Sequence, residues 1–396
     1  MSEARHLTSD VSRADPDPCF LTDYNGAFMK RVILSGGGTG GHIYPAITIA
    51  KEIAKLEETE FLFVGTPNGM ESRIIPKEGY RFASLPASGL KRKLTLENIS
   101  ILCHAAGSLF KARRILKDFA PDVVIGTGGY VCGPILMAAA LSHIPTLIQE
   151  QNVIPGITNK ILSRVVDKIA LGYEAAAPRF PHPEKCIYTG NPIRPDIMEA
   201  KREASRRALG LSPDTFMVLV TGGSRGARTI NTAMLDVHRH FKDVKDLCLY
   251  HVTGELEYDK ITSALGCDED GHFGSASRII RYEYHMPNAL AAADLIICRA
   301  GAISLAEVAA RELPAILIPY PYAAEDHQTY NARVFSEAGA AKMILDKDVT
   351  GARFIENITA LREHPEDLQT MEKSIGTLKK VHAGEDIARL ALSLIK

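Results

Sequence analysis

Short apolar runs and longer helical patterns follow one another along the chain in a repeating order. The apolar run 31–34 leads into a glycine-rich segment, and apolar residues at helical spacing then extend to Leu56. Apolar runs at 123–125, 216–220 and 294–298 are each followed in the same way by a glycine-containing loop and a helical pattern. This alternation predicts an α/β protein with parallel sheets, whose ligands bind at the carboxyl ends of the strands.

The first glycine loop, Ser35-Gly36-Gly37-Gly38-Thr39-Gly40-Gly41-His42, carries the clearest sign of a ligand. Glycines let a ligand approach the backbone, and a helix start offers unpaired N–H groups to a phosphate. The loop lacks the Gly-Lys-Ser/Thr of a Walker A motif. It fits the dinucleotide fingerprint, but the second strand, 60–64, runs into Gly65-Thr66-Pro67 without the carboxylate that an NAD site needs. A tight turn without any ligand is the alternative interpretation.

The chain divides into two similar halves. A second glycine loop follows strand 123–125, a third one, Thr221-Gly222-Gly223-Ser224-Arg225-Gly226, follows strand 216–220, and the proline-rich connector 189–195 separates them. We therefore predict two Rossmann-like parallel-sheet domains that face each other across a cleft, at 29–193 and 194–382. We expect the last helix, in 383–396, to pack back on the first domain and the polar residues 1–28 to be a disordered extension.

Composition narrows the class of protein. The chain has 396 residues, 46% of them hydrophobic, and a net charge of −1, which argues against a nucleic-acid partner. Its seven cysteines are scattered without a Cys-x-x-Cys pair and are typical of reduced thiols. No metal-binding cluster is evident, so helix dipoles and backbone N–H groups would have to neutralise a diphosphate.

Several residues of the second half have both a structural and a functional interpretation. Ser304-Leu305-Ala306-Glu307 fits a capping box, or else a helix start facing a diphosphate with Glu307 on a ribose diol. Arg194 is either an exposed linker charge or a phosphate partner. Gln328 begins a helix at a strand end, where sugar hydroxyls bind.

Two residues of the first half complete the candidate site. His42 follows the first glycine loop and could be a general base on an acceptor hydroxyl, because the unperturbed pKa of histidine suits neutral pH. The alternative is a helix residue that only donates a hydrogen bond. Asn152 ends a strand and is either a ligand contact or a turn residue.

From residue 29 onward the chain resembles the MurG family of peptidoglycan glycosyltransferases. The motifs that carry the resemblance are Gly37-Gly38-Thr39-Gly40-Gly41-His42, Gly128-Gly129-Tyr130-Val131, Glu150-Gln151-Asn152, Gly190-Asn191-Pro192-Ile193-Arg194, Gly222-Gly223-Ser224, Cys298-Arg299-Ala300-Gly301-Ala302 and Asp326-His327-Gln328. The resemblance implies a GT-B fold. It also implies an inverting transfer of N-acetylglucosamine from UDP-N-acetylglucosamine to the muramyl 4-hydroxyl of lipid I, which gives lipid II, without a metal or other cofactor.

The resemblance also implies a set of site residues, with the donor held by the second domain. The substrate contacts that it implies are Thr39, Gly40, Gly41, Asn152, Arg194, Ser224, Glu283, Ala302, Ile303, Ser304, Leu305, Ala306, Glu307 and Gln328. Two positions depart from the family pattern. Arg225 stands where the family usually has glutamine, and Glu283 replaces an apolar residue beside the uracil, where a backbone contact would survive.

Other functions remain open at this stage. They are an NAD-dependent enzyme, a UDP-sugar epimerase of similar two-domain fold, and a non-catalytic nucleotide-sugar module. The first is weakened by the missing second-strand carboxylate, and the last would not need His42.

A basic and apolar segment predicts where the protein works. Between residues 89 and 117 the seven basic residues Lys91, Arg92, Lys93, Lys111, Arg113, Arg114 and Lys117 are interleaved with leucine, isoleucine and phenylalanine. An ordinary amphipathic helix is the structural alternative. Because a lipid-linked acceptor stays in the bilayer, we expect a peripheral protein on an anionic membrane surface, at the cytoplasmic face of the plasma membrane.

Overall fold

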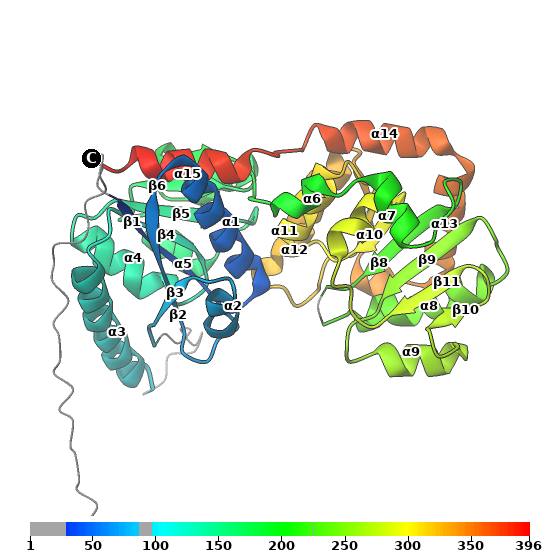
Figure 1. Cartoon of the computed structure of the whole chain (residues 1–396), viewed down its shortest axis with the longest axis horizontal. Coiled ribbons are helices and arrows are strands. Elements are labelled where there is room, and N and C mark those ends of the chain that lie inside the picture. The colour runs from blue at the N-terminus through cyan, green and yellow to red at the C-terminus, as the bar shows by residue number, and fades with distance from the viewer. Residues whose placement is uncertain (1–28, 87–96, 224) are drawn as a thin grey trace, which may run out of the picture.

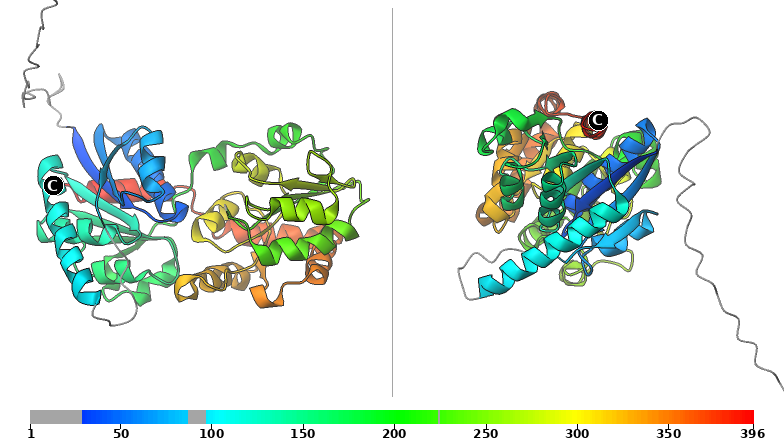
Figure 2. Two further views of the ribbon diagram at one scale, coloured as in Figure 1. Left: turned by 90° about the horizontal axis from the view of Figure 1, so that it is seen from below. Right: turned by 90° about the vertical axis from the view of Figure 1, so that its left-hand side faces the viewer.

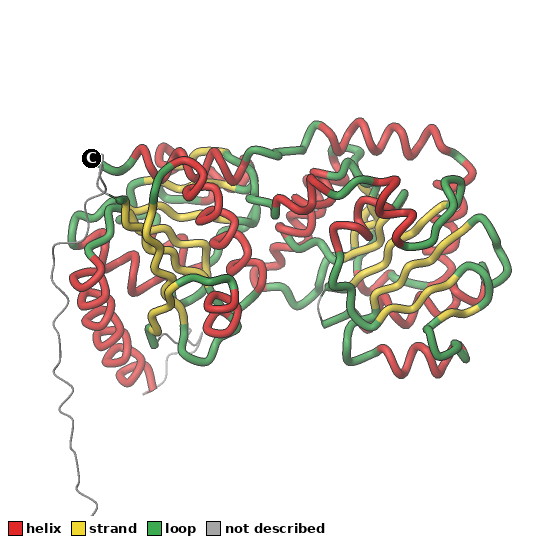
Figure 3. Tube along the Cα trace, viewed as in Figure 1, coloured by secondary structure: helices red, strands yellow, loops and turns green. Residues whose placement is uncertain are grey.

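The structure is a computed structural model that describes residues 29–86, 97–223 and 225–396. The described residues form two α/β units, each built on a seven-stranded sheet with helices on both faces (Figures 1 and 3). The predicted pair of Rossmann-like domains is confirmed. The proposed extension 1–28, Ser224 and the basic residues Lys91, Arg92 and Lys93 lie outside the described residues, and the domain boundaries stay a prediction.

The first sheet has the strand order β3-β2-β1-β4-β5-β6-β7 and is parallel throughout. Its elements in chain order are β1 (Lys30–Gly36), α1 (Gly40–Leu56), β2 (Thr59–Gly65), α2 (Glu71–Lys77), β3 (Arg81–Ser84), α3 (Glu97–Phe119), β4 (Val123–Gly128), α4 (Cys132–Leu141), β5 (Thr146–Glu150), α5 (Ile157–Leu162), β6 (Lys168–Leu171) and β7 (Cys186–Tyr188). Both faces of this sheet are covered, so its central strands β4 and β5 are buried along their whole length.

The second sheet has the order β10-β11-β9-β8-β12-β13-β14, and only its edge strand β10 pairs antiparallel among the described strands. Its elements are α6 (Pro195–Glu199), α7 (Arg202–Ala208), β8 (Phe216–Thr221), α8 (Arg228–His240), β9 (Leu247–Val252), α9 (Tyr258–Leu265), β10 (His272–Phe273), β11 (Ser277–Ile280), α10 (Met286–Ala292), β12 (Leu295–Cys298), α11 (Ala302–Ala310), β13 (Ala315–Leu317), α12 (His327–Glu337), β14 (Ala341–Met343), α13 (Gly351–Glu363) and α14 (Pro365–Gly376).

The chain crosses between the two units twice. It passes from β7 to α6 through 189–194, and it returns from α14 to the last helix, α15 (Ala383–Ser393), which lies over the first unit (Figure 1). Ile387, Ala388 and Ala391 of α15 are fully buried in one cluster with apolar residues of α1 and β1. The return of α15 thus ties the end of the chain to the first sheet.

Two helices, one that begins with glycine and one that begins with alanine, start earlier than the sequence pattern predicts. The apolar residues at helical spacing begin at Pro45, but helix α1 begins at Gly40. Helix α11 begins at Ala302, not at Ser304. The first turn of a helix need not pack apolar side chains against the core, and its N–H groups have no acceptors within the helix. Hydrophobic spacing therefore does not mark where a helix begins. The predicted starts were therefore too late.

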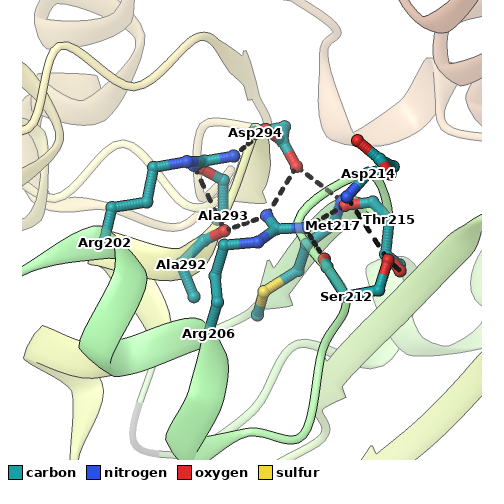
Figure 4. A network of polar contacts seen from close by, with 9 residues as sticks. All are labelled: Arg202, Arg206, Ser212, Asp214, Thr215, Met217, Ala292, Ala293 and Asp294. Atoms are coloured by element: carbon teal, nitrogen blue, oxygen red, sulfur yellow. Dashed lines mark hydrogen bonds and ion pairs between the residues drawn. The ribbon is translucent and has the colours of Figure 1, made fainter.

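Asp294 ties α7 to the second sheet through a polar network (Figure 4). Its Oδ2 accepts the N–H of Met217 at 2.7 Å and lies 3.3 Å from a guanidinium nitrogen of Arg206, which is buried. The same guanidinium donates to the carbonyls of Ala292 and Ser212, each at 2.8 Å. Because the buried cation has several acceptors, its desolvation is offset, and α7 is fixed beside β8.

Candidate active site

The first and second glycine loops pack directly against each other. The N–H of Gly37 donates to the carbonyl of Gly128 at 3.2 Å. Gly129 has φ of +87°, and a Cβ there would come within 2.5 Å of the Gly37 carbonyl oxygen. Close backbone contact between the two loops therefore accounts for part of the glycine content that the sequence attributed to a ligand.

His42 lies in the first turn of α1, where its ring bridges the two loops. Nδ1 is 2.9 Å from the carbonyl oxygen of Gly37, so Nδ1 carries the proton and donates, and Nε2 is left as an acceptor. Nε2 faces Gly128, where an added Cβ would come within 2.9 Å of it. Burial lowers the pKa of His42, although the Gly37 bond opposes the shift. A neutral ring with a free Nε2 has the form that a general base needs.

Thr39, Gly40 and Gly41 form the start of α1, the helix that carries His42. Thr39 is the N-cap residue, with its hydroxyl 3.5 Å from Nδ1 of His42. Gly40 and Gly41 are the first helical residues. Their N–H groups belong to the positive end of a seventeen-residue helix, which favours a negative ligand.

The segment after β5 is folded around one buried carboxylate, that of Glu150. It accepts hydrogen bonds from the N–H of Asn152 at 2.9 Å, from the N–H of Gly156 at 3.0 Å and from the amide of Asn159 at 2.8 Å. The loop is thereby held at the carboxyl end of β5, with Asn152 at its tip.

Asn152 and its neighbour contact the second domain through Asn331 of α12. The side-chain amide of Asn331 donates to Oδ1 of Asn152 at 3.1 Å, and its oxygen accepts the N–H of Val153 at 3.0 Å. Asn331 is fully buried and also donates to the carbonyl of Ala300 at 3.3 Å. Sequence analysis missed this residue, because an asparagine inside a helix has no local signal for a partner 178 positions away.

The start of helix α11 differs from the capping-box interpretation. Its N-cap is Gly301, and no side chain caps it. Ser304 is the third helical residue and is exposed, so it cannot be the N-cap of a box with Glu307. The N–H groups of 302–304 lie at the positive end of the helix. Leu305 packs wholly in the core, and its N–H donates to the carbonyl of Gly301 at 2.9 Å.

Glu307 and Arg194 form an ion pair, although 113 positions separate them. Nε of Arg194 lies 3.1 Å from Oε1 of Glu307, whose side chain is 12% exposed. Burial raises the pKa of Glu307, and the guanidinium opposes that shift. The guanidinium of Arg194 also lies over the ring of Tyr44 from α1, with its Cζ 5.9 Å from the ring centroid. The pair therefore lies where the two domains meet, and Arg194 is not a free linker charge.

Glu283 and Gln328 are two further predicted contacts, and Ala306, also predicted, is partly buried in α11 against the apolar core. The carboxylate of Glu283 accepts from the hydroxyl of Tyr250 and from the N–H of His285, the latter at 2.6 Å. Gln328 accepts the N–H of Tyr320 at 2.9 Å through its amide oxygen. The carboxylate of Glu283 is thus bound by residues of its own domain. The hydrogen bond from Tyr320, in the loop after β13, fixes the orientation of the Gln328 amide.

Glu71 is a further residue of the site that sequence analysis missed. It begins α2, which follows β2 after the loop 66–70, and the residue is 1% exposed. It accepts the N–H of Thr66 at 2.9 Å, the hydroxyl of Thr66 at 2.6 Å and the N–H of Gly38 at 3.1 Å. A carboxylate does stand near the end of the second strand, but its oxygens are used by these three donors. The spacing Gly65-Thr66 to Glu71 is the signal that could have revealed it.

Among the residues that the structure describes, no group of three or more His, Cys, Asp or Glu could hold a metal ion. The helix starts of α1 and α11 and the guanidinium of Arg194 are the positive groups that the described site offers to a diphosphate.

Two family models match the chain. The glycosyltransferase family 28 N-terminal domain matches residues 32–171, and the glycosyltransferase family 28 C-terminal domain matches 217–387. A UDP-N-acetylglucosamine–N-acetylmuramyl-(pentapeptide) pyrophosphoryl-undecaprenol N-acetylglucosamine transferase from Thermoanaerobacter sp. (strain X514) is 45% identical, over 92% of this chain and 100% of the relative. The chain belongs to the MurG family of glycosyltransferases.

Solved structures agree with this membership of the MurG family. The crystal structure of Acinetobacter baumannii MurG has a TM-score of 0.74 and 27% identity, over 92% of this chain and 99% of that one. A UDP-GlcNAc 2-epimerase from Neisseria meningitidis bound to UDP-GlcNAc has a TM-score of 0.64 and 16% identity, over 92% and 100%. The second likeness concerns the fold alone. The GT-B arrangement implied by the sequence is confirmed.

We predict that replacing Glu307 with alanine weakens UDP binding about 10- to 100-fold, because a charge-assisted bond to a ribose diol contributes roughly 1.5–3 kcal/mol. Isothermal titration with UDP and thermal denaturation should be run on the same preparation. Asp196→Ala is the matched control, since Asp196 is the second, exposed partner of Arg194 at 3.8 Å. A lower melting temperature with unchanged UDP affinity would show that Glu307 only pairs with Arg194.

Proposed function

We propose that the protein transfers N-acetylglucosamine from UDP-N-acetylglucosamine to the muramyl 4-hydroxyl of undecaprenyl-pyrophosphoryl-MurNAc-pentapeptide, converting lipid I to lipid II in peptidoglycan synthesis. The observation that carries the proposal is the division of the site between the domains. A neutral histidine with a free Nε2 lies on the first, and a helix start beside an Arg–Glu pair lies on the second.

The donor is assigned to the second domain. In this proposal the diphosphate binds at the start of α11, where the N–H groups and the helix dipole attract its charge. The ribose diol donates to Glu307, Arg194 turns to the diphosphate, and the uracil lies against the backbone of Glu283. Gln328 and Asn152 hold the sugar, and Ser224 lies outside the described residues.

The reaction then follows from the position of His42. Nε2 accepts the proton of the acceptor hydroxyl, whose oxygen attacks the anomeric carbon on the face opposite the diphosphate. The bond between that carbon and the diphosphate oxygen breaks, and UDP leaves with the electron pair. A single displacement of this kind inverts the anomeric configuration. The helix starts stabilise the departing charge without reorganising.

The decisive experiment incubates the purified protein with radiolabelled UDP-N-acetylglucosamine, with and without a lipid I analogue. We expect label in the lipid product only when the acceptor is present. Release of free N-acetylmannosamine without an acceptor would instead support a UDP-sugar epimerase, the alternative that shares this fold. Absence of both products would contradict the proposed transfer.

We predict that His42→Ala lowers kcat about 10²- to 10⁴-fold, the usual contribution of a general base, and leaves UDP affinity unchanged. Because burial lowers the pKa of His42, the wild-type kcat should be constant near pH 7 and fall only as the pH drops below the ordinary histidine value of about 6.5. His182→Ala, a half-exposed histidine paired with Glu184, is the control. Turnover within a few-fold of wild type would leave His42 a structural hydrogen-bond donor.

We also propose that the protein docks on the cytoplasmic face of the plasma membrane through α3. Within the described ranges, no helix is long and apolar enough to span a bilayer. Helix α3 lies on the outer side of the first domain, away from the second (Figure 2). Its Phe110 is 75% exposed, and Lys111, Arg113, Arg114 and Lys117 are exposed beside it. Each such cation contributes about 1 kcal/mol at an anionic surface.

Vesicle co-sedimentation tests the docking surface with anionic and neutral lipids at low and high salt. We expect binding to anionic vesicles that salt weakens, and at least a tenfold loss in K111E/R113E/K117E, because three cations contribute roughly 3 kcal/mol. The control K201E/K245E/K347E has the same charge change at exposed positions of the second domain. Equal loss in both variants, or equal binding to neutral lipid, would contradict docking through α3 and leave the enzyme assignment intact.

A further inference from the structure

Glu71 and His42 are linked through a single peptide group of the first glycine loop. The Glu71 carboxylate accepts the N–H of Gly38 at 3.1 Å, and the carbonyl of Gly37, on the other side of that peptide, accepts Nδ1–H of His42 at 2.9 Å. A hydrogen bond at one end of a peptide polarises the group and strengthens the bond at its other end. In a catalytic triad a carboxylate accepts the Nδ1–H of the histidine directly and so orients the imidazole. Here the Gly37–Gly38 peptide lies between the carboxylate of Glu71 and the imidazole of His42.

The loop leaves Glu71 no room to move. An added Cβ at Gly37 or Gly69 would come within 2.5 Å or 2.3 Å of its Oε1, and one at Gly65 within 2.4 Å of its Cγ. Three glycines therefore close around one buried side chain. Burial acts to raise the pKa of Glu71, but the hydrogen bonds from Thr66 and Gly38 outweigh it and the pKa is lowered. The carboxylate thus stays ionised at neutral pH.

We propose that Glu71 is a positioning residue for the transfer reaction, which fixes the Gly37–Gly38 peptide so that His42 keeps its proton on Nδ1 and presents Nε2 to the acceptor hydroxyl. Its carboxylate is engaged by Thr66 and Gly38, so this role needs no contact between Glu71 and a substrate. The inference rests on the proposed function, since it assigns Glu71 a role through the general base of that reaction.

The first test replaces Glu71 with glutamine, whose amide cannot accept all three donors. We expect kcat to fall about 10- to 100-fold while the Kd for UDP, which binds the other domain, stays unchanged. Glu78→Gln is the matched control, because Glu78 ends the same helix and pairs with Lys51 at the surface. Unchanged kcat in E71Q, or a fall that matches a loss of folded protein, would overturn the proposal.

A double-mutant cycle separates positioning from folding. If Glu71 acts through His42, E71Q in the H42A background should cost less than about threefold, because the group that it positions is already gone. The same 10- to 100-fold loss in both backgrounds would mean that Glu71 supports the domain and not the base.

The pH profile is a second readout. Burial lowers the pKa of His42, and the charge of His327 in the other domain acts in the same direction, whereas the carboxylates of Glu150 and Glu71 oppose the shift. Removing the charge of Glu71 should move the acid limb of kcat to lower pH in E71Q. An unmoved limb together with a lower kcat would assign the loss to something other than His42.

Thr66→Val covers the case in which E71Q does not fold. It removes one of the three donors to Glu71 and keeps the N–H of Thr66. We expect a three- to tenfold lower kcat with unchanged UDP affinity. If both variants fold and turn over like wild type while the wild type makes lipid II, the inference fails alone. If the wild type transfers no sugar, the proposed function fails first.

Discussion

The loops at the carboxyl edge of the first sheet depend on two buried carboxylates. Backbone N–H groups that leave a sheet lose their ladder partners, and each one buried without an acceptor costs free energy. Glu71 supplies acceptors to the loops after β1 and β2, and Glu150 supplies them to the loop after β5. Each charge is in turn stabilised by several donors. These hydrogen bonds between carboxylates and backbone N–H groups set the shape of this edge of the sheet, and with it the positions of His42 and Asn152.

The two domains contribute different chemistry to the candidate site. The first offers an imidazole held by rigid loops, and the second offers a helix start with the Arg194–Glu307 pair beside it. Asn331 joins them by hydrogen bonds to Asn152 and Val153. Val153 and Tyr173 also pack into the apolar cluster of the second domain. A ligand that binds Glu307 in place of Arg194 would therefore break an ion pair at the boundary between the two domains.

Glycine serves two purposes in the loops. Gly129 permits the first and second loops to touch, and Gly226, with φ of +75°, lies so close to the Thr253 carbonyl that a Cβ would come within 1.9 Å of its oxygen. These glycines are needed for packing whether or not a ligand is bound. Gly38 and Gly223 have positive φ with open space around the missing side chain, so packing alone does not require them.

The sequence by itself determined the class of fold, the two-domain plan and the family. Alternation of apolar runs with helical patterns is a local property, and the motifs from Gly37 to Gln328 are contiguous, so neither needs a folded chain to be recognised. Helix starts at Gly40 and Ala302 escaped detection because a first turn has no apolar stripe.

Only the tertiary structure decided how the polar groups are paired. Ser304-x-x-Glu307 has the spacing of a capping box, yet Gly301 caps the helix and Glu307 binds Arg194 from the interdomain connector. Asn331 has no motif around it, and Glu71 has only its spacing from Gly65-Thr66. Both become parts of the site because packing buries them beside unpaired backbone groups. A buried polar side chain takes whichever partner the fold brings within hydrogen-bond distance, and that partner is set by three-dimensional packing, which spacing along the chain does not record.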